Sequence, residues 1–110
     1  MREIKAIIRR DRLSGVVHAL HEINGMPGMT VSVVHGYGRA DSEHPGRTEP
    51  IVETQLAKLE TVVPLGLVDL VVATIRSAAH TGRPGDGKIF VIPVEAVKRI
   101  GTLDHSDPTS

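Results

Sequence analysis

The sequence predicts an α+β domain in which two helices cover one face of a four-stranded antiparallel sheet. Two observations lead to this prediction. The 110 residues suffice for a single domain, 1–110. Within them, apolar residues at period 2 followed by apolar residues at helical spacing occur twice, 55 positions apart. Each copy therefore indicates a strand followed by a helix, and a further strand-like segment follows each of them.

The first half of the chain contains the first copy. Ile4, Ala6 and Ile8 alternate along a strand. Four apolar residues with i, i+3, i+4, i+7 spacing then predict a helix: Leu13, Val16, Val17 and Leu20. Turn-forming residues at 24–28 end this helix, and residues 29–35, Met-Thr-Val-Ser-Val-Val-His, predict the second strand.

The second half repeats this order. Residues 59–63 alternate, and the helical set that follows is Val68, Val71, Val72 and Ile75. A break at 81–87 precedes a strand over 88–94, and a short β-like segment is expected near Arg99. The order β-α-β-β-α-β is that of a ferredoxin-like sandwich.

The sheet face turned away from the helices is predicted to be apolar. Ile7 of the first strand lies on it, with four residues from the other strands: Val34, Val62, Phe90 and Ile92. Two helices cover only one side of such a sheet, so the chain is expected to bury the other side against copies of itself. The alternative is that these residues lie singly on a hydrated face.

The connection between the two halves is unusually long. Residues 36–56 join two strands for which a hairpin of about two to five residues would suffice. Glycine, proline and charged residues within it predict an exposed mobile loop, and long loops of this kind often carry function.

The composition excludes several classes of function. Thirteen basic and thirteen acidic side chains cancel, so nucleic acid is not an expected partner. Cysteine is absent, which excludes thiol catalysis and disulfides. No apolar run reaches the roughly 18 residues of a membrane span, so a cytoplasmic protein without direct membrane insertion is expected. No catalytic set of side chains is apparent, and the chain is not expected to be an enzyme.

Residues 82–88, Gly-Arg-Pro-Gly-Asp-Gly-Lys, form the most unusual segment. They match G-x-x-x-x-G-K, but Ile89 stands where nucleotide hydrolases need Ser or Thr. A helix precedes the segment and a strand follows it, the reverse of the hydrolase motif, so a P-loop hydrolase is excluded. Glycine N–H groups together with Lys88 and Arg83 can still hold a phosphate. The alternative is a tight turn without a ligand.

Four of the histidines are candidates for a metal site: His18, His21, His35 and His44. His18 and His21 are three positions apart on the first helix, where two ring nitrogens can share a metal. No H-E-x-x-H or similar signature is present, so no metal site is expected. A trimeric metal-binding or metal-tolerance protein on the same fold is the alternative function.

Five segments together resemble the PII signal-transduction (nitrogen regulatory) family. They are residues 4–8, 28–31, 36–39, 59–64 and 81–90, and the last is the most specific. The resemblance implies a ferredoxin-like homotrimer that binds ATP or ADP in clefts between subunits. It also implies three loops: a T-loop at about 36–56 that contacts partner proteins, a B-loop at about 81–88 and a C-loop at about 99–110.

The resemblance assigns nucleotide contacts residue by residue. Phosphate contacts fall to the turn after the second strand, the B-loop and the C-loop: Gly36, Gly38, Arg39, Gly85, Asp86, Gly87, Lys88 and Arg99. The positions around the adenine are Met29, Thr30, Glu60 and Val62. The two aromatic residues, Tyr37 and Phe90, are expected beside the same cleft.

Three positions depart from the family pattern. Ala40 replaces a Gln that helps to hold Mg²⁺ and 2-oxoglutarate, Leu56 replaces a Lys that contacts this acid, and Gly101 replaces a second C-loop Arg. Mg²⁺ is therefore a doubtful companion of the nucleotide, and no Tyr lies between Arg39 and Lys58 for uridylylation. The resemblance implies a non-enzymatic, ATP- or ADP-binding signalling protein. Its T-loop would control an unidentified enzyme or transporter, with a membrane transporter as one candidate.

Overall fold

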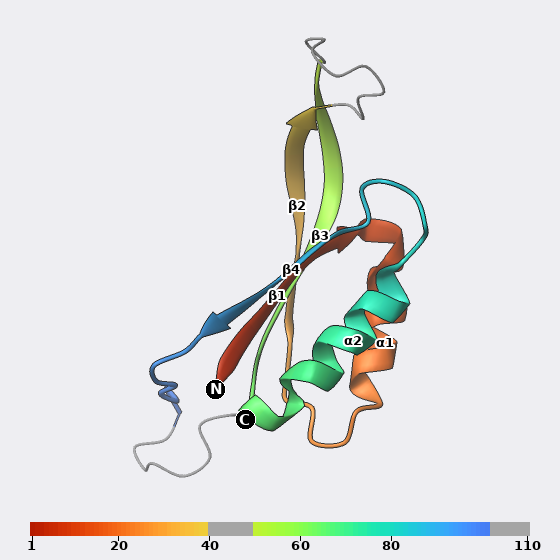
Figure 1. The fold of residues 1–110 in the computed structure, drawn as a ribbon. Coiled ribbons are helices and arrows are strands. Elements are labelled where there is room, and N and C mark those ends of the chain that lie inside the picture. The colour runs from red at the N-terminus through yellow and green to blue at the C-terminus, as the bar shows by residue number, and fades with distance from the viewer. Residues whose placement is uncertain (40–49, 102–110) are drawn as a thin grey trace.

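The computed structural model describes residues 1–39 and 50–101 and shows the predicted sandwich (Figure 1). Its strands and helices, in chain order, are β1 (Arg2–Arg9), α1 (Leu13–His21), β2 (Thr30–Arg39), β3 (Ile51–Val63), α2 (Val68–Ala79) and β4 (Gly87–Pro93). Neighbouring strands are antiparallel in the order β2-β3-β1-β4, and both helices lie on one face of the sheet. The ferredoxin-like βαββαβ prediction is therefore confirmed.

The core lies between the sheet and the helices. On the strands its residues alternate along the chain: Ile4, Ala6, Ile8, Ala57, Leu59 and Val63. On the helices they recur at helical spacing: Val16, Leu20, Val71, Ile75 and Ala79. Each helix follows a short 3-10 turn, η1 (Arg10–Arg12) or η2 (Leu65–Leu67). The repeat in the sequence is thus a repeat of strand, turn and helix.

The face of the sheet away from the helices carries apolar and charged side chains side by side. The strand register places the four predicted apolar residues on it: Val34, Val62, Phe90 and Ile92. Two ion pairs lie on the same face, Lys5–Glu3 with 3.8 Å between Nζ and Oε1 and Lys58–Glu60 with 3.6 Å. Phe90 and Ile92 remain 44% and 36% exposed, so a single chain leaves apolar surface uncovered here.

The long connection is shorter than the sequence predicts. β2 and β3 stay paired to their ends and form a two-stranded ribbon that extends past the rest of the sheet (Figure 1). Residues 36–39 and 51–56, the base of the predicted T-loop, are therefore strand, whereas 40–49 lie outside the described residues. Gly36 does not interrupt strand β2. A Cβ at this position would lie 2.7 Å from Cδ1 of Leu56, so glycine makes room for that side chain.

The C-terminal end of the described chain also differs from the prediction. Residues 94–101 form no strand, although a short β-like segment is predicted near Arg99. Pro93, which lacks a backbone N–H, ends β4, and β1 already pairs with a strand on each side. A hydrogen bond from Val94 N to Met1 O at 3.3 Å holds the start of this segment.

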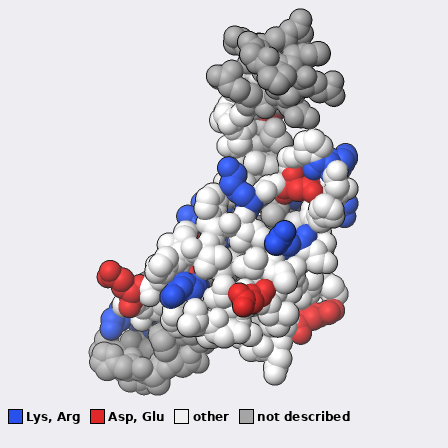
Figure 2. Space-filling model, in the orientation of Figure 1, with Lys and Arg blue, Asp and Glu red and all other residues white. Residues whose placement is uncertain are grey.

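Charges of both signs are mixed on the surface. On the face shown in Figure 2, Lys and Arg side chains are interspersed with Asp and Glu. The described part of this face has no continuous basic patch of the kind that binds nucleic acid, in line with the net charge of zero. None of the helices described here has the length and apolarity needed to cross a membrane.

Candidate functional site

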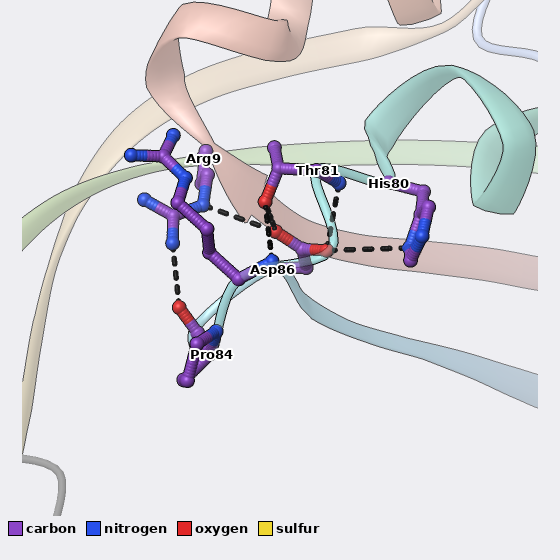
Figure 3. Close-up of polar contacts among 6 residues, drawn as sticks. Arg9, His80, Thr81, Pro84 and Asp86 are labelled. Atoms are coloured by element: carbon purple, nitrogen blue, oxygen red, sulfur yellow. Dashed lines mark hydrogen bonds and ion pairs between the residues drawn. The ribbon is translucent and has the colours of Figure 1, made fainter.

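The glycine-rich segment after α2 forms a loop that closes around the carboxylate of Asp86 (Figure 3). Thr81 binds this carboxylate twice, because its N–H donates to Oδ2 at 2.8 Å and its hydroxyl donates to Oδ1. The N–H of Arg83 donates to Oγ1 of Thr81 at 3.1 Å. These bonds tie the two ends of the loop together.

Arg9, the last residue of β1, reaches the same loop from the sheet (Figure 3). Its Nε donates to Oδ1 of Asp86 at 3.1 Å, and its Nη2 donates to the carbonyl oxygen of Pro84 at 2.5 Å. On the other side of the carboxylate, Nδ1 of His80 lies 3.5 Å from Oδ2 of Asp86. The carboxylate therefore accepts hydrogen bonds from the loop and from the sheet, and the His80 ring lies beside it.

These surroundings hold the pKa of Asp86 well below its ordinary value of 3.8. The hydrogen bond from the hydroxyl of Thr81 lowers this pKa most, and the bond from the Thr81 N–H is the next largest cause. The bond from Arg9 also lowers the pKa, whereas desolvation raises it. The carboxylate is thus charged at neutral pH, and its oxygens accept hydrogen bonds from the protein. This placement gives Asp86 a structural role inside the loop.

Acid should therefore weaken the fold through Asp86. Its pKa is lower in the folded than in the unfolded chain, so its charge stabilises the fold above the unfolded value near 3.8. That contribution is lost as the pH falls through the folded value. Between neutral pH and about pH 2, the free energy of unfolding in urea should fall more steeply for the wild type than for Asp86→Asn. Parallel curves for the two proteins would contradict this role.

Three glycines allow the loop to take this shape, with φ of 80° at Gly82, 88° at Gly85 and 112° at Gly87. At Gly87, a Cβ would lie 1.9 Å from the carbonyl oxygen of Ile7, so β4 passes too close to β1 for any side chain. Gly85 and Lys88 are exposed. Exposed glycine backbone beside a lysine is an arrangement that can bind an anion.

A cavity of about 330 Å³ lies between this loop and the base of the ribbon. Its lining comes from the end of β1, from η1, from β3 and from the loop: Arg9, Arg10, Asp11, Thr54, Gln55, Leu56 and Gly85. Thr54 pairs with Gly36, and Gly85 belongs to the glycine-rich loop. The two segments predicted to contact phosphate, at Gly36 and in this loop, therefore lie on either side of the same cavity. Nη1 of Arg10 donates to Oε1 of Gln55 at 2.7 Å and joins η1 to the ribbon.

A second cavity, of about 410 Å³, lies between α2 and β4. Its lining includes the apolar residues Ile8, Ile75 and Ile89, and Arg76 of α2 is a basic residue beside them. It also includes Asp86 and Gly87, so the glycine-rich loop contributes to both cavities.

The remaining predicted site residues are spread over the sheet. Most share the face away from the helices: Thr30, Gly36, Gly38, Glu60, Val62, Lys88 and Phe90. Tyr37 lies on the opposite face of the ribbon from Gly36 and Gly38 and is 70% exposed, and Met29 packs against the core. Arg39 ends β2, and Arg99 is exposed in the segment after β4.

One chain does not gather these residues into one site. Thr30 and Phe90 lie in the same row of the sheet but on opposite edge strands, about 14 Å apart at three strand spacings. Thr30 also precedes Gly36 by six positions on β2, which corresponds to about 20 Å along the strand. The predicted adenine positions are therefore separated from the predicted phosphate positions.

Arg9 belongs to the loop site although no motif in the sequence marks it. Strand β1 pairs with β4 up to Ile8 and Gly87. Arg9 follows Ile8 and Asp86 precedes Gly87, so the same register brings these two residues together. Its position beside Asp86 follows from this register, which depends on pairing between segments far apart in the chain. Local sequence therefore does not predict the contact of Arg9 with the loop.

The candidate metal residues do not converge. Nε2 of His18 lies 3.3 Å from Oε1 of Glu22 on the exposed side of α1, and Nδ1 of His35 lies 2.6 Å from Oε1 of Glu53 on the ribbon. His21 is exposed on α1, and His44 lies outside the described residues. Within the described ranges, no group of three or more His, Asp or Glu side chains could hold a metal. The metal-binding alternative is not supported.

Comparison with known proteins identifies the family. The model of the family "Nitrogen regulatory protein P-II" matches residues 1–103. Proteins named nitrogen regulatory protein P-II from Azospirillum brasilense and Synechocystis sp. are 45% and 48% identical over 105 residues, 93% of each chain. Nitrogen regulatory protein P-II 1 from Escherichia coli K12 is 42% identical over 110 residues, 97% of each chain. Together with the ferredoxin-like fold, these matches confirm the resemblance seen in the sequence, and the chain belongs to the nitrogen regulatory protein P-II family.

Proposed function

We propose that this chain is a non-enzymatic regulator that binds ATP or ADP and signals the bound nucleotide to a partner protein. Membership of the P-II family makes it a signal-transduction protein. The observation that most favours a nucleotide is the glycine-rich loop, which places the exposed Gly85 at a cavity beside the base of the ribbon and is followed by the exposed Lys88. Phosphate groups are the ligands suited to exposed glycine backbone next to a lysine.

In this proposal the nucleotide lies between two copies of the chain. The loop and the ribbon base of one copy hold the phosphates, whereas the adenine contacts the region of Thr30, Glu60 and Val62 on the next. The separation of these sets within one chain supports a shared site. The uncovered apolar residues of the sheet, Phe90 and Ile92 among them, supply surface for a homotrimer.

The signal travels along the ribbon. β3 runs without interruption from the buried Leu59 to the exposed Ile51, so a ligand at the ribbon base acts on a strand that continues toward the T-loop. ATP and ADP differ by one phosphate, and a difference in their contacts with the loop shifts which ribbon conformation is favoured. A target protein, such as an enzyme or a membrane transporter, reads that difference.

Lys88→Ala should weaken ATP binding strongly. Loss of one charged hydrogen bond to a phosphate costs about 1.5–3 kcal/mol, so Kd should rise roughly 10- to 150-fold. Isothermal titration calorimetry with ATP, ADP and AMP measures this on both proteins, and the nucleotide should be recovered intact afterwards.

Arg12→Ala serves as the control for charge. Arg12 is an exposed cation of η1 that lines neither of the two cavities described above, so its loss should leave Kd unchanged. Absence of ATP binding by the wild type at millimolar concentration would reject the proposal. Equal binding by wild type and Lys88→Ala would remove Lys88 from the site.

A further inference from the structure

We propose that Arg9 is a positioning residue for the glycine-rich loop. It fastens residues 84–86 to the end of β1 and so keeps the loop in the orientation that receives an anion. The inference rests on the proposed function where nucleotide affinity is concerned, but the state of the loop can be measured without any nucleotide. Arg9 has this role through its contacts with the protein and does not itself contact the ligand.

The contacts of Arg9 lie on either side of Gly85, one of the loop glycines with a positive φ. One bond goes to the carbonyl oxygen of Pro84 and the other to the carboxylate of Asp86, one position on each side of Gly85. Gly85 has a φ of 88°, and a Cβ added to it would lie 3.5 Å from Nη2 of Arg9. The guanidinium therefore lies against the turn that its two bonds span, as Figure 3 shows for the labelled partners.

The loop needs this tie because its internal bonds leave its orientation open. The bonds from Thr81 to Asp86 close the loop on itself, but both residues belong to the loop. The backbone ladder between β1 and β4 ends at the pair Ile8 and Gly87. Beyond that pair, the side chain of Arg9 connects β1 to the loop through its bonds to Pro84 and Asp86. These bonds set the position of the loop relative to the sheet.

The charge of Arg9 is already matched within the protein. The side chains of Arg9 and Asp86 are only 26% and 24% exposed, and their separation of 3.1 Å makes a partly shielded ion pair. A guanidinium paired with a carboxylate adds little net attraction for a phosphate. Lys88, which is exposed on the adjoining strand, remains the cation suited to contact a ligand directly.

The first test measures the loop in the free protein by amide hydrogen exchange. In Arg9→Met, the N–H groups of Thr81 and Arg83, which are bonded in the wild type, should exchange about tenfold faster. The N–H of Leu59 in β3 should keep its wild-type rate, which shows that the fold is intact. Arg12→Met, which removes the same charge from η1, should change none of these rates. Unchanged exchange at Thr81 and Arg83 would overturn the proposal.

The second test separates positioning from direct contact by ATP titration. Arg9→Met and Asp86→Asn should each raise the Kd for ATP about tenfold, and the double variant should be no weaker than the weaker single one. The salt dependence of Kd should match that of the wild type. Additive losses, or a shallower salt dependence in Arg9→Met, would show a direct contact with phosphate and overturn the proposal.

Arg9→Lys provides a second variant that keeps the charge. A single ammonium group cannot reproduce the two divergent bonds of the guanidinium, so exchange at Thr81 should stay raised although the charge is retained. Full rescue by lysine would mean that charge alone matters and would overturn the proposal. If the wild type binds no nucleotide, the proposed function fails, and the exchange measurements still decide the role of Arg9.

Discussion

Gly87→Ala is expected to lower the free energy of unfolding by about 3 kcal/mol, because it combines backbone strain with overpacking. Gly87 has a φ of 112°, which L-residues rarely adopt. Its added methyl group would also lie 1.9 Å from the carbonyl oxygen of Ile7, a backbone atom that cannot rotate away. β4 would have to move away from β1 at its first residue. Urea denaturation followed by far-UV circular dichroism measures the loss.

The control for this substitution is Gly66→Ala. Gly66 lies in η2 and does not have a positive φ, and a Cβ added to it would meet no atom within 4 Å. The stability of this variant should stay within about 0.5 kcal/mol of the wild type. If Gly87→Ala unfolds at the same urea concentration as Gly66→Ala, the close approach of β4 to β1 is not as the structure describes it. The displaced strand should also separate Arg9 from Asp86 and weaken nucleotide binding.

Leu59→Ala is expected to lower the free energy of unfolding by about 3–4 kcal/mol, through lost burial and a residual cavity. Leu59 is fully buried on β3, a central strand, and pairs with Ala6 on one side and Val31 on the other. Neither neighbour is large enough to fill the space that the deleted side chain leaves. The same denaturation experiment measures the effect.

Leu70→Ala removes the same atoms from a different environment. Leu70 lies on α2 and is 51% exposed in the single chain, so its replacement should cost far less than that of Leu59. Equal losses for the two leucine variants would mean that the core does not lie between the helices and the sheet. A larger loss for Leu70 would instead point to burial of this helix face between copies.

Much of the fold could be predicted from local pattern because burial follows the periods of strands and helices. Val16, Leu20, Val71 and Ile75 are buried on their helices as the spacing requires. The ribbon could not be predicted, because composition alone assigns Gly36 to a turn. In the structure its lack of a side chain makes room for Leu56, a residue of the neighbouring strand whose proximity local sequence does not reveal.

The sequence predicts only the part of the candidate site whose residues are consecutive in the chain. The glycine-rich loop stands out in the sequence because its residues are consecutive, and the structure closes it around Asp86 as one unit. The contribution of Arg9 depends on a register between residues 77 positions apart in the chain. The adenine half of the site, around Thr30 and Glu60, depends on a further copy of the chain in our proposal, which no single-chain pattern specifies.

The strand order β2-β3-β1-β4 has a consequence for biosynthesis. β1 is made first but lies inside the sheet, and its two neighbours begin only at Ile51 and Gly87. A nascent chain therefore leaves backbone N–H and C=O groups on the edges of β1 without their strand partners until both later strands have left the ribosome. Contacts of such long sequence separation form slowly. We expect the domain to complete its fold only after Pro93 and the end of β4 have emerged.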